Sequence, residues 1–211
     1  MATQKMDTGV ITLSNAIGME ITPYVSNNGV LELGDTTYDI TEIVADTVSI
    51  TPDDNEVNTV DAEFRDTPLF ENVTLGQVQF AATCTDFQND MMKAIFGWDE
   101  VTQGTGQNVK KAVIAPLNYE ELYAAIVVRF ANRHVVLPKV KMNSKAVLAT
   151  LKTGYGEGQL AGTAYAGYVS FDAAASDPTK ANTKQTTWGF IPASSGEATM
   201  DYRFLASEPA S

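Results

Sequence analysis

The sequence contains one cysteine and one histidine in 211 residues, and this scarcity excludes several kinds of site. Cys84 cannot form a disulfide within the chain, which fits synthesis in a reducing compartment. Zinc sites need several cysteine or histidine ligands, and Cys84 and His134 are the only two such residues. A serine–histidine–aspartate site would need His134, but the Gly-x-Ser-x-Gly turn is absent. We therefore expect no metal, no cofactor and no enzymatic activity.

Long apolar runs and ligand-binding loops are also missing. No apolar stretch approaches the roughly 20 residues that a membrane helix needs. Residues 1–10 lack the charged and then apolar regions of a signal peptide, so no secretion is expected. The acidic turn Pro52–Asn55 lacks calcium-loop spacing. The segment Gly104–Gly106 lacks the ending of a phosphate-binding loop, so we expect no nucleotide site.

Basic residues are few, and the charge is unevenly distributed along the chain. The net charge is −12. Residues 1–92 contain 16 acids and two bases, whereas residues 110–152 contain eight bases and two acids, giving −14 and +6. An acidic protein is a poor nucleic-acid binder, because phosphate binding needs a basic surface. The asymmetry fits either two differently solvated faces or association of an acidic surface with a basic one on another copy.

What the chain does contain is β-strand pattern, and it is strongest between Tyr119 and Tyr168. Four successive strands are predicted there, separated by short turns. In the second strand, the alternation predicts one face with His134, Val136, Pro138 and Val140, and another with Val135, Leu137, Lys139 and Lys141. Both faces carry apolar residues. A second layer or neighbouring subunits must therefore cover the second face.

One helix is predicted, following a strong strand at 74–83. Thr85 to Gln88 match a capping box, Met91 and Ile95 are spaced on one helical face, and Gly97 ends the helix. We expect this helix, at about 85–96, to lie against the sheet.

Residues 56–64 are predicted to form a strand with two very different faces. Thr59, Asp61 and Glu63 alternate with apolar residues, and such an acidic, hydroxylated face requires water. It would be either the outer surface of a monomer or the inner wall of a pore. We expect it to pair with a strand of the 134–152 region.

The predicted fold class is mainly β, a β-sandwich or split barrel with one flanking helix and extended N- and C-terminal arms. We expect an N-terminal arm at 1–19 and the β domain at 20–169. Residues 170–211 are expected to form a linker and a C-terminal arm or final strand. Residues 98–110 and 172–187 are predicted to be loops.

The order of these elements resembles a known family. An acidic first half, a strand leading into one capped helix, and a meander containing Val136–Met142 and Gly154–Leu160 are similar to the major tail tube protein of long-tailed bacteriophages. The type VI secretion tube protein shares that architecture. The resemblance implies a structural virion protein that is made in the host cytoplasm. It implies hexameric rings stacked into a tube whose lumen conducts DNA during genome ejection.

The resemblance also implies partners and sites. The partners would be copies of the chain, other tail proteins at the tube ends, and DNA that passes without specific binding; no membrane is involved. An acidic lumen lets a polyanion slide. The lumen-facing candidates are Thr59, Asp61 and Glu63, and the inter-subunit candidates are Lys139, Lys141, Lys145 and Lys152.

Two other functions stay open at this stage. One is a capsid-decorating or receptor-binding β-sandwich virion protein, which would present the loops 98–110 and 172–187 to a partner. The other is a carbohydrate-active or hydrolytic β protein. That function would require a cleft with convergent carboxylates, and no spacing in the sequence identifies one.

Overall fold

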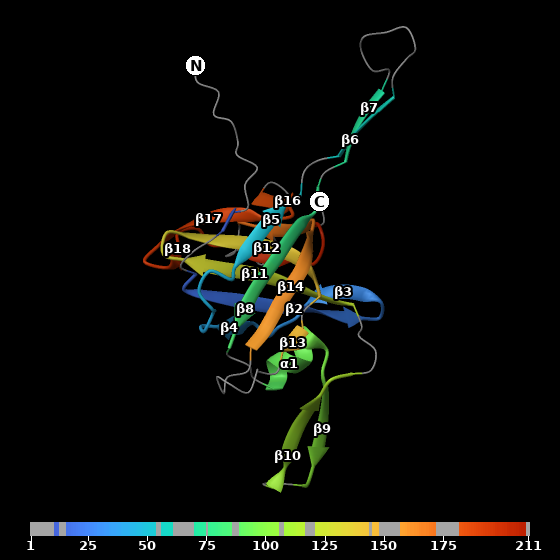
Figure 1. The fold of residues 1–211 in the computed structure, drawn as a ribbon, viewed down its shortest axis with the longest axis vertical. Helices are drawn as coiled ribbons and strands as arrows, with labels where there is room; N and C mark the ends of the chain where they lie inside the picture. The colour runs from blue at the N-terminus through green and yellow to red at the C-terminus, as the bar shows by residue number, and fades with distance from the viewer. Residues whose placement is uncertain are drawn as a thin grey trace.

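The chain folds into a curled β-sheet body from which two hairpins project (Figure 1). The computed structural model describes most of the chain. The described residues are 11–12, 16–53, 56–60, 70–74, 76–85, 89–105, 108–116, 121–143, 145–147, 157–171 and 182–209. Within them the structure is mainly β with one short helix, which confirms the expected fold class.

The main sheet is antiparallel and brings together segments that are far apart in the sequence. Its order is β1 (Ile11–Thr12), β5 (Ser49–Pro52), β8 (Val78–Cys84), β14 (Glu157–Tyr165), β12 (Arg133–Met142), β11 (Leu122–Phe130), β2 (Gly18–Asn27) and β3 (Val30–Leu33). The short strand β4 (Tyr38–Ile40) pairs with β2 alongside β3.

The sheet curls until its two ends approach each other. The chain that leaves β4 passes along β8, where Ile43 forms an isolated bridge with Cys84. The Val44 amide donates to the carbonyl oxygen of Thr83 at 2.8 Å, and the Thr85 amide donates to that of Glu42 at 3.1 Å. These bonds satisfy edge groups that an open sheet would leave unpaired. The result is barrel-like, as the split-barrel expectation proposed.

The core lies inside this curl because strand residues alternate between two faces. Along β8, Val78, Phe80, Ala82 and Cys84 are buried, and the residues between them are half-buried. The Cys84 side chain is fully buried, as its position on the apolar face predicts.

Helix α1 (Asn89–Phe96) contributes its apolar face to the same core. Met91, Met92, Ile95 and Phe96 are buried there. The helix ends at Gly97, whose φ of 66° places it in the left-handed region. Its amide donates to the carbonyl oxygen of Lys93 at 3.1 Å. The described part of the helix begins at Asn89, and residues 86–88 of the expected helix lie outside the described residues.

The capping box predicted at that start is only partly described. The Thr85 hydroxyl donates to the Glu42 carboxylate at 3.0 Å. Gln88, the other member of the box, lies outside the described residues.

The predicted meander is present, with one important difference in strand β12. β11, β12 and β14 pair in succession, and β13 (Lys145–Val147) joins β14. Between β11 and β12 the register shifts: Ala124 faces Val140, whereas Ile126 faces Leu137. One extra residue therefore enters β12 at Pro138–Lys139, which is a β-bulge.

The bulge overturns the simple alternation expected along β12. The main core contains both odd-numbered and even-numbered residues of β12, namely Val135, Leu137, Val140 and Met142. In a regular strand the odd-numbered and the even-numbered residues would lie on opposite faces. Proline has no N–H to donate, so a bulge is where a central strand tolerates it. The freed Pro138 carbonyl oxygen accepts a hydrogen bond from the buried Tyr24 hydroxyl at 2.9 Å.

The second face of the meander is covered by the C-terminal part of the chain. Val127 and Val136 pack with Ile191 of β17 (Gly189–Ser194), and Tyr202 and Phe204 pack against them. β17 pairs with β12 and with β18 (Glu197–Ala198). β15 (Gly167–Ser170) pairs with β16 (Thr183–Thr186) and β19 (Arg203–Leu205). The sequence analysis expected either a second layer or neighbouring subunits over this face. The structure shows a second layer, formed by the same chain.

Two hairpins project from opposite ends of this body (Figure 1). One consists of β6 (Glu56–Val60) and β7 (Phe70–Thr74), and the other of β9 (Asp99–Gln103) and β10 (Lys110–Ile114). Two expectations were wrong here. Residues 98–110 are largely this second hairpin and not a loop. In the described part of the chain, β6 pairs with β7 and with no strand of the 134–152 region.

Within the described residues, no helix combines the length and the apolar character needed to cross a membrane.

The Tyr24 hydrogen bond gives a stability prediction. Burial raises the pKa of the Tyr24 hydroxyl to about 12, so the group is a neutral donor at ordinary pH. Replacement by phenylalanine leaves a buried carbonyl oxygen at the bulge without this donor. We expect Tyr24→Phe to lower the free energy of unfolding by about 1–2 kcal/mol in urea denaturation.

Tyr165→Phe is the matched control, because Tyr165 is exposed and the same atom is removed. It should change stability by less than about 0.5 kcal/mol. Equal effects of the two substitutions would contradict the role given to the Tyr24 hydroxyl.

Candidate assembly interface

The residues proposed from sequence lie in three different parts of the structure. Thr59 belongs to β6, on the projecting β6–β7 hairpin, and Lys145 belongs to β13. Asp61, Glu63 and Lys152 lie outside the described residues. Lys139 and Lys141 lie on β12, next to the bulge. The structure therefore brings Lys139 and Lys141 together, and the grouping of the other candidates stays a prediction.

Lys139 and Lys141 are on the outer face of the sheet, in contact with aromatic and acidic groups. Cross-strand register places Lys139 opposite Tyr165 and Lys141 opposite Tyr123. The Lys139 ammonium lies 5.1 Å from the centre of the Tyr123 ring, a cation–π contact. Tyr123 and Tyr165 meet edge to face, with ring centres 6.4 Å apart.

Lys141 is paired within its own chain. Its ammonium donates to the Glu121 carboxylate, and the Tyr123 hydroxyl donates to the same carboxylate at 3.2 Å. The hydrogen bond to Glu121 raises the pKa of Lys141, and the bond from Lys141 lowers the pKa of Glu121. Lys139 has no ion pair among the described residues and is the better placed of the two to meet a second molecule.

A second charged cluster holds β4 against the sheet. The Arg129 guanidinium of β11 donates to Glu20 of β2 at 3.1 Å and also to Asp39 of β4. The three side chains are partly exposed, but their charges are paired with one another. The cluster therefore holds β4 in place and leaves no unpaired charge for a partner.

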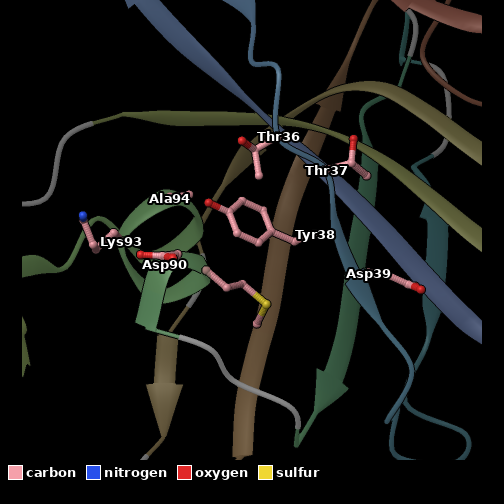
Figure 2. A pocket seen from close by; sticks show the side chains of 8 residues that line it. Thr36, Thr37, Tyr38, Asp39, Asp90, Lys93 and Ala94 are labelled. Carbon is pink, nitrogen blue, oxygen red and sulfur yellow. The ribbon is translucent and has the colours of Figure 1, made fainter. Parts of the chain in front are cut away.

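A broad depression lies between β4 and α1. It has a volume of about 760 Å³ and is lined by Thr36, Thr37, Tyr38, Asp39, Asp90, Met91, Lys93 and Ala94. Figure 2 shows the Tyr38 ring directed toward α1, while Asp39 points away on the other side of the strand. The carboxylates of Asp39 and Asp90 therefore do not converge on the depression. Among the described residues, no group of three or more histidine, cysteine, aspartate or glutamate side chains is placed to hold a metal ion.

His134 contributes to the fold through two contacts. The ring is buried; its Nε2 lies 2.9 Å from the Gly196 carbonyl oxygen, and its Nδ1 lies 3.3 Å from the Tyr202 hydroxyl. Because a carbonyl oxygen can only accept, Nε2 donates to it, and in a neutral ring Nδ1 is then the acceptor for the Tyr202 hydroxyl. Desolvation by burial raises the pKa of that tyrosine hydroxyl. His134 thus attaches the C-terminal layer to β12.

The β9–β10 hairpin has one covered face and one exposed face. Opposite residues of an antiparallel pair share a face. Glu100 is paired with Val113, both are half-buried, and Val113 packs against the main core. The other face is exposed throughout: Asp99 is opposite Ile114, Val101 opposite Ala112, and Gln103 opposite Lys110.

An ion-pair cluster fixes the covered face to the helix. The Glu100 carboxylate binds Lys93 of α1 at 3.2 Å and Lys111 of β10 at 3.2 Å. The hydrogen bonds from Lys111 and then Lys93 are the main causes that lower the pKa of Glu100. The hairpin is thereby directed away from the body with its second face open.

The β2–β3 hairpin also has an exposed apolar face. Its turn uses Asn28 and Gly29, with φ of 52° and 81°, as the Asn-Gly sequence predicts for a tight hairpin turn. Val25 lies opposite Glu32, and Asn27 lies opposite Val30; all four side chains are exposed.

The exposed hairpin faces were missed by the sequence analysis. The signal at 99–103 is weak, because only Val101 is apolar in that strand and the glycines after it favour a loop. Pairing with the stronger strand Lys110–Ile114 decides the structure.

The Glu100 cluster yields a pH prediction. Because the pKa of the folded carboxyl is lowered, the cluster stabilises the fold above the unfolded value of 4.5 and loses this contribution as pH falls through the folded pKa. We expect a carboxyl-carbon NMR titration to place Glu100 below 4.5.

In Lys111→Met the Glu100 pKa should move back toward 4.5, since the largest lowering contribution is removed. Lys184→Met, an exposed lysine on β16, should leave it unchanged. A Glu100 carboxyl that titrates identically in all three proteins would disprove the cluster.

Comparison with known proteins assigns no family to this geometry. No protein-family model matches the chain, and no curated protein matches it. Among solved structures, a chain in the six-fold symmetrised cryo-EM structure of the anti-feeding prophage baseplate is similar. The identity is 9% and the TM-score is 0.34, with 90% of this chain and 97% of that chain covered. At this TM-score the likeness carries no argument about function.

Proposed function

We propose that this protein is a non-enzymatic structural subunit that assembles with copies of itself into stacked hexameric rings forming a phage tail tube. The proposal includes an acidic lumen that conducts DNA during genome ejection, other tail proteins at the tube ends, and a place in the virion tail. It extends the resemblance found in the sequence.

The observation that carries the proposal is the pair of hairpins leaving opposite ends of the body (Figure 1). A two-stranded hairpin alone in water is marginally stable and needs packing on at least one face. The β9–β10 hairpin is held on one face only, and its other face exposes Val101 and Ile114. Extensions at both ends of a subunit fit end-to-end repetition, because each end then has a surface for the next copy.

The charge of the chain supports a conduit for DNA and not a DNA-binding role. The net charge of −12 repels phosphates and so favours passage without binding. Thr59, Asp61 and Glu63 remain our candidates for the lumen wall, with Thr59 located on the β6–β7 hairpin.

Electron microscopy of the purified protein at increasing concentration tests the proposal. We expect rings and then tubes with a continuous central channel, in the absence of any other component or after addition of an initiating tail complex. Monomers or trimers that bind preformed capsids would instead support a capsid-decorating role. A channel lined by lysine and arginine would contradict the acidic lumen.

The Lys139 and Lys141 surface gives a separate prediction. We expect Lys139→Glu combined with Lys141→Glu to impair polymerisation while circular dichroism and thermal unfolding still show a folded protein. The physical reason is that Lys139, which is half-buried, has no ion pair among the described residues, and that Lys141→Glu places a second carboxylate beside Glu121.

Lys184→Glu is the control, since it reverses an exposed lysine on β16, which pairs with β15 and not with β12. It should assemble like the wild type. Normal assembly of the double variant, measured by light scattering, would exclude this surface from the contact.

A further inference from the structure

We propose that the exposed face of the β9–β10 hairpin of one copy docks onto the exposed face of the β2–β3 hairpin of a second copy. This inference rests on the proposed self-assembly and names the contact that produces it. The two faces are called the β9–β10 face (Asp99, Val101, Gln103, Lys110, Ala112 and Ile114) and the β2–β3 face (Val25, Asn27, Val30 and Glu32).

The β9–β10 face presents a continuous apolar strip. Val101 and Ala112 are directly opposite each other, and Ile114 is the next residue on the same face. Val101 is 49% exposed and Ile114 is 53% exposed. Exposed apolar residues are ordinary when they are scattered singly, but adjacent ones on a projecting element mark an interaction surface.

The β2–β3 face also exposes apolar side chains, on a different part of the body. Val25 and Val30 are 50% and 61% exposed, and the register places them on one face of the hairpin. The reverse face of this hairpin carries the buried Tyr24 and the half-buried Leu31 and Leu33, so only one side is available to a partner. Each hairpin therefore has one face used within the chain and one face left open.

The charges of the two faces are complementary. The β9–β10 face carries Lys110 near its tip, and the β2–β3 face carries Glu32 between the two valines. Among the described residues, the hydrogen bond that Glu32 accepts is a long one, 3.4 Å, from the Asn27 side-chain amide. Each face thus combines two exposed branched apolar residues with charged side chains. Lys110, at the tip of the β9–β10 face, is opposite in sign to Glu32 of the β2–β3 face. Asp99, at the base of the β9–β10 face, lies at the other end of the strip from Lys110.

A second copy is the occupant that fits these observations. The side chains of both faces are exposed in the chain itself, so neither face is covered by the other within one molecule. Figure 1 shows the β9–β10 hairpin leaving one end of the body and β3 at its side. Contact between two different faces is heterologous, which generates rings or filaments and not closed pairs.

Single substitutions on each face test the contact. We expect Val101→Asp and Val30→Asp each to raise the critical concentration for assembly at least tenfold, because a carboxylate replaces an apolar side chain in the contact. Met200→Asp is the matched control, since Met200 is 48% exposed, belongs to neither face and gains the same charge. It should assemble like the wild type. Thermal unfolding verifies that all three variants are folded.

A mixing experiment distinguishes this contact from a general loss of assembly. Val101→Asp keeps an intact β2–β3 face, and Val30→Asp keeps an intact β9–β10 face. Mixed together, they should form 1:1 dimers in sedimentation equilibrium that do not grow, because each dimer has only damaged faces left. Two variants of the same kind should stay monomeric.

The charge pair is tested by exchange. Lys110→Glu and Glu32→Lys should each weaken assembly about tenfold, and the variant carrying both should recover to within about threefold of the wild type. A double variant no better than the single ones would overturn the pairing of Lys110 with Glu32.

The outcomes separate this inference from the function on which it rests. If the wild type assembles and Val101→Asp and Val30→Asp assemble equally well, the hairpin contact is wrong and the tube function stands. If the wild type remains monomeric at every concentration, with and without an initiating tail complex, the proposed function is wrong and the contact fails with it.

Discussion

The bulge at Pro138–Lys139 is the constraint on which the fold depends. It changes the parity of β12, so that Val135 and Leu137 before it and Val140 and Met142 after it all reach one core. It also divides the strand between two partners. β12 pairs with β17 along Arg133–Val136 and with β14 along Lys139–Met142. A proline at the division removes a donor where regular pairing is interrupted, and Tyr24 binds the carbonyl that is left.

Because β12 pairs with β14 and also with β17 of the C-terminal layer, the chain covers apolar surface of its own meander. The second face of the meander is closed by Ile191, Tyr202 and Phe204, and His134 holds that layer through the Gly196 carbonyl. The central strands therefore do not need other copies to complete them. Among the described residues, the apolar surfaces left open include one face of each of two hairpins. We therefore expect these projections, in addition to the Lys139 and Lys141 surface of the sheet, to contact other copies.

The uneven charge along the sequence is partly neutralised by folding. Lys111 binds Glu100, Arg129 binds Glu20 and Asp39, and Lys141 binds Glu121, so these three bases of the 110–152 segment are paired within the chain. Such partly exposed pairs contribute modestly to stability, but they determine which cations remain for a partner. Lys110, Arg133 and Lys139 are the bases of that segment that form no ion pair in the part of the chain that the structure describes.

The sequence by itself determined the fold class, the core face of β8, the apolar stripe of α1 and the Asn28–Gly29 turn, because each depends on short-range periodicity or on backbone conformation. It also determined that Cys84 is buried. Only the tertiary structure decided which side chains of β12 face the core, which segment covers the second face of the meander, and that β9 and β10 form a hairpin. Those features depend on which distant strand lies alongside, and local pattern carries no information about that partner.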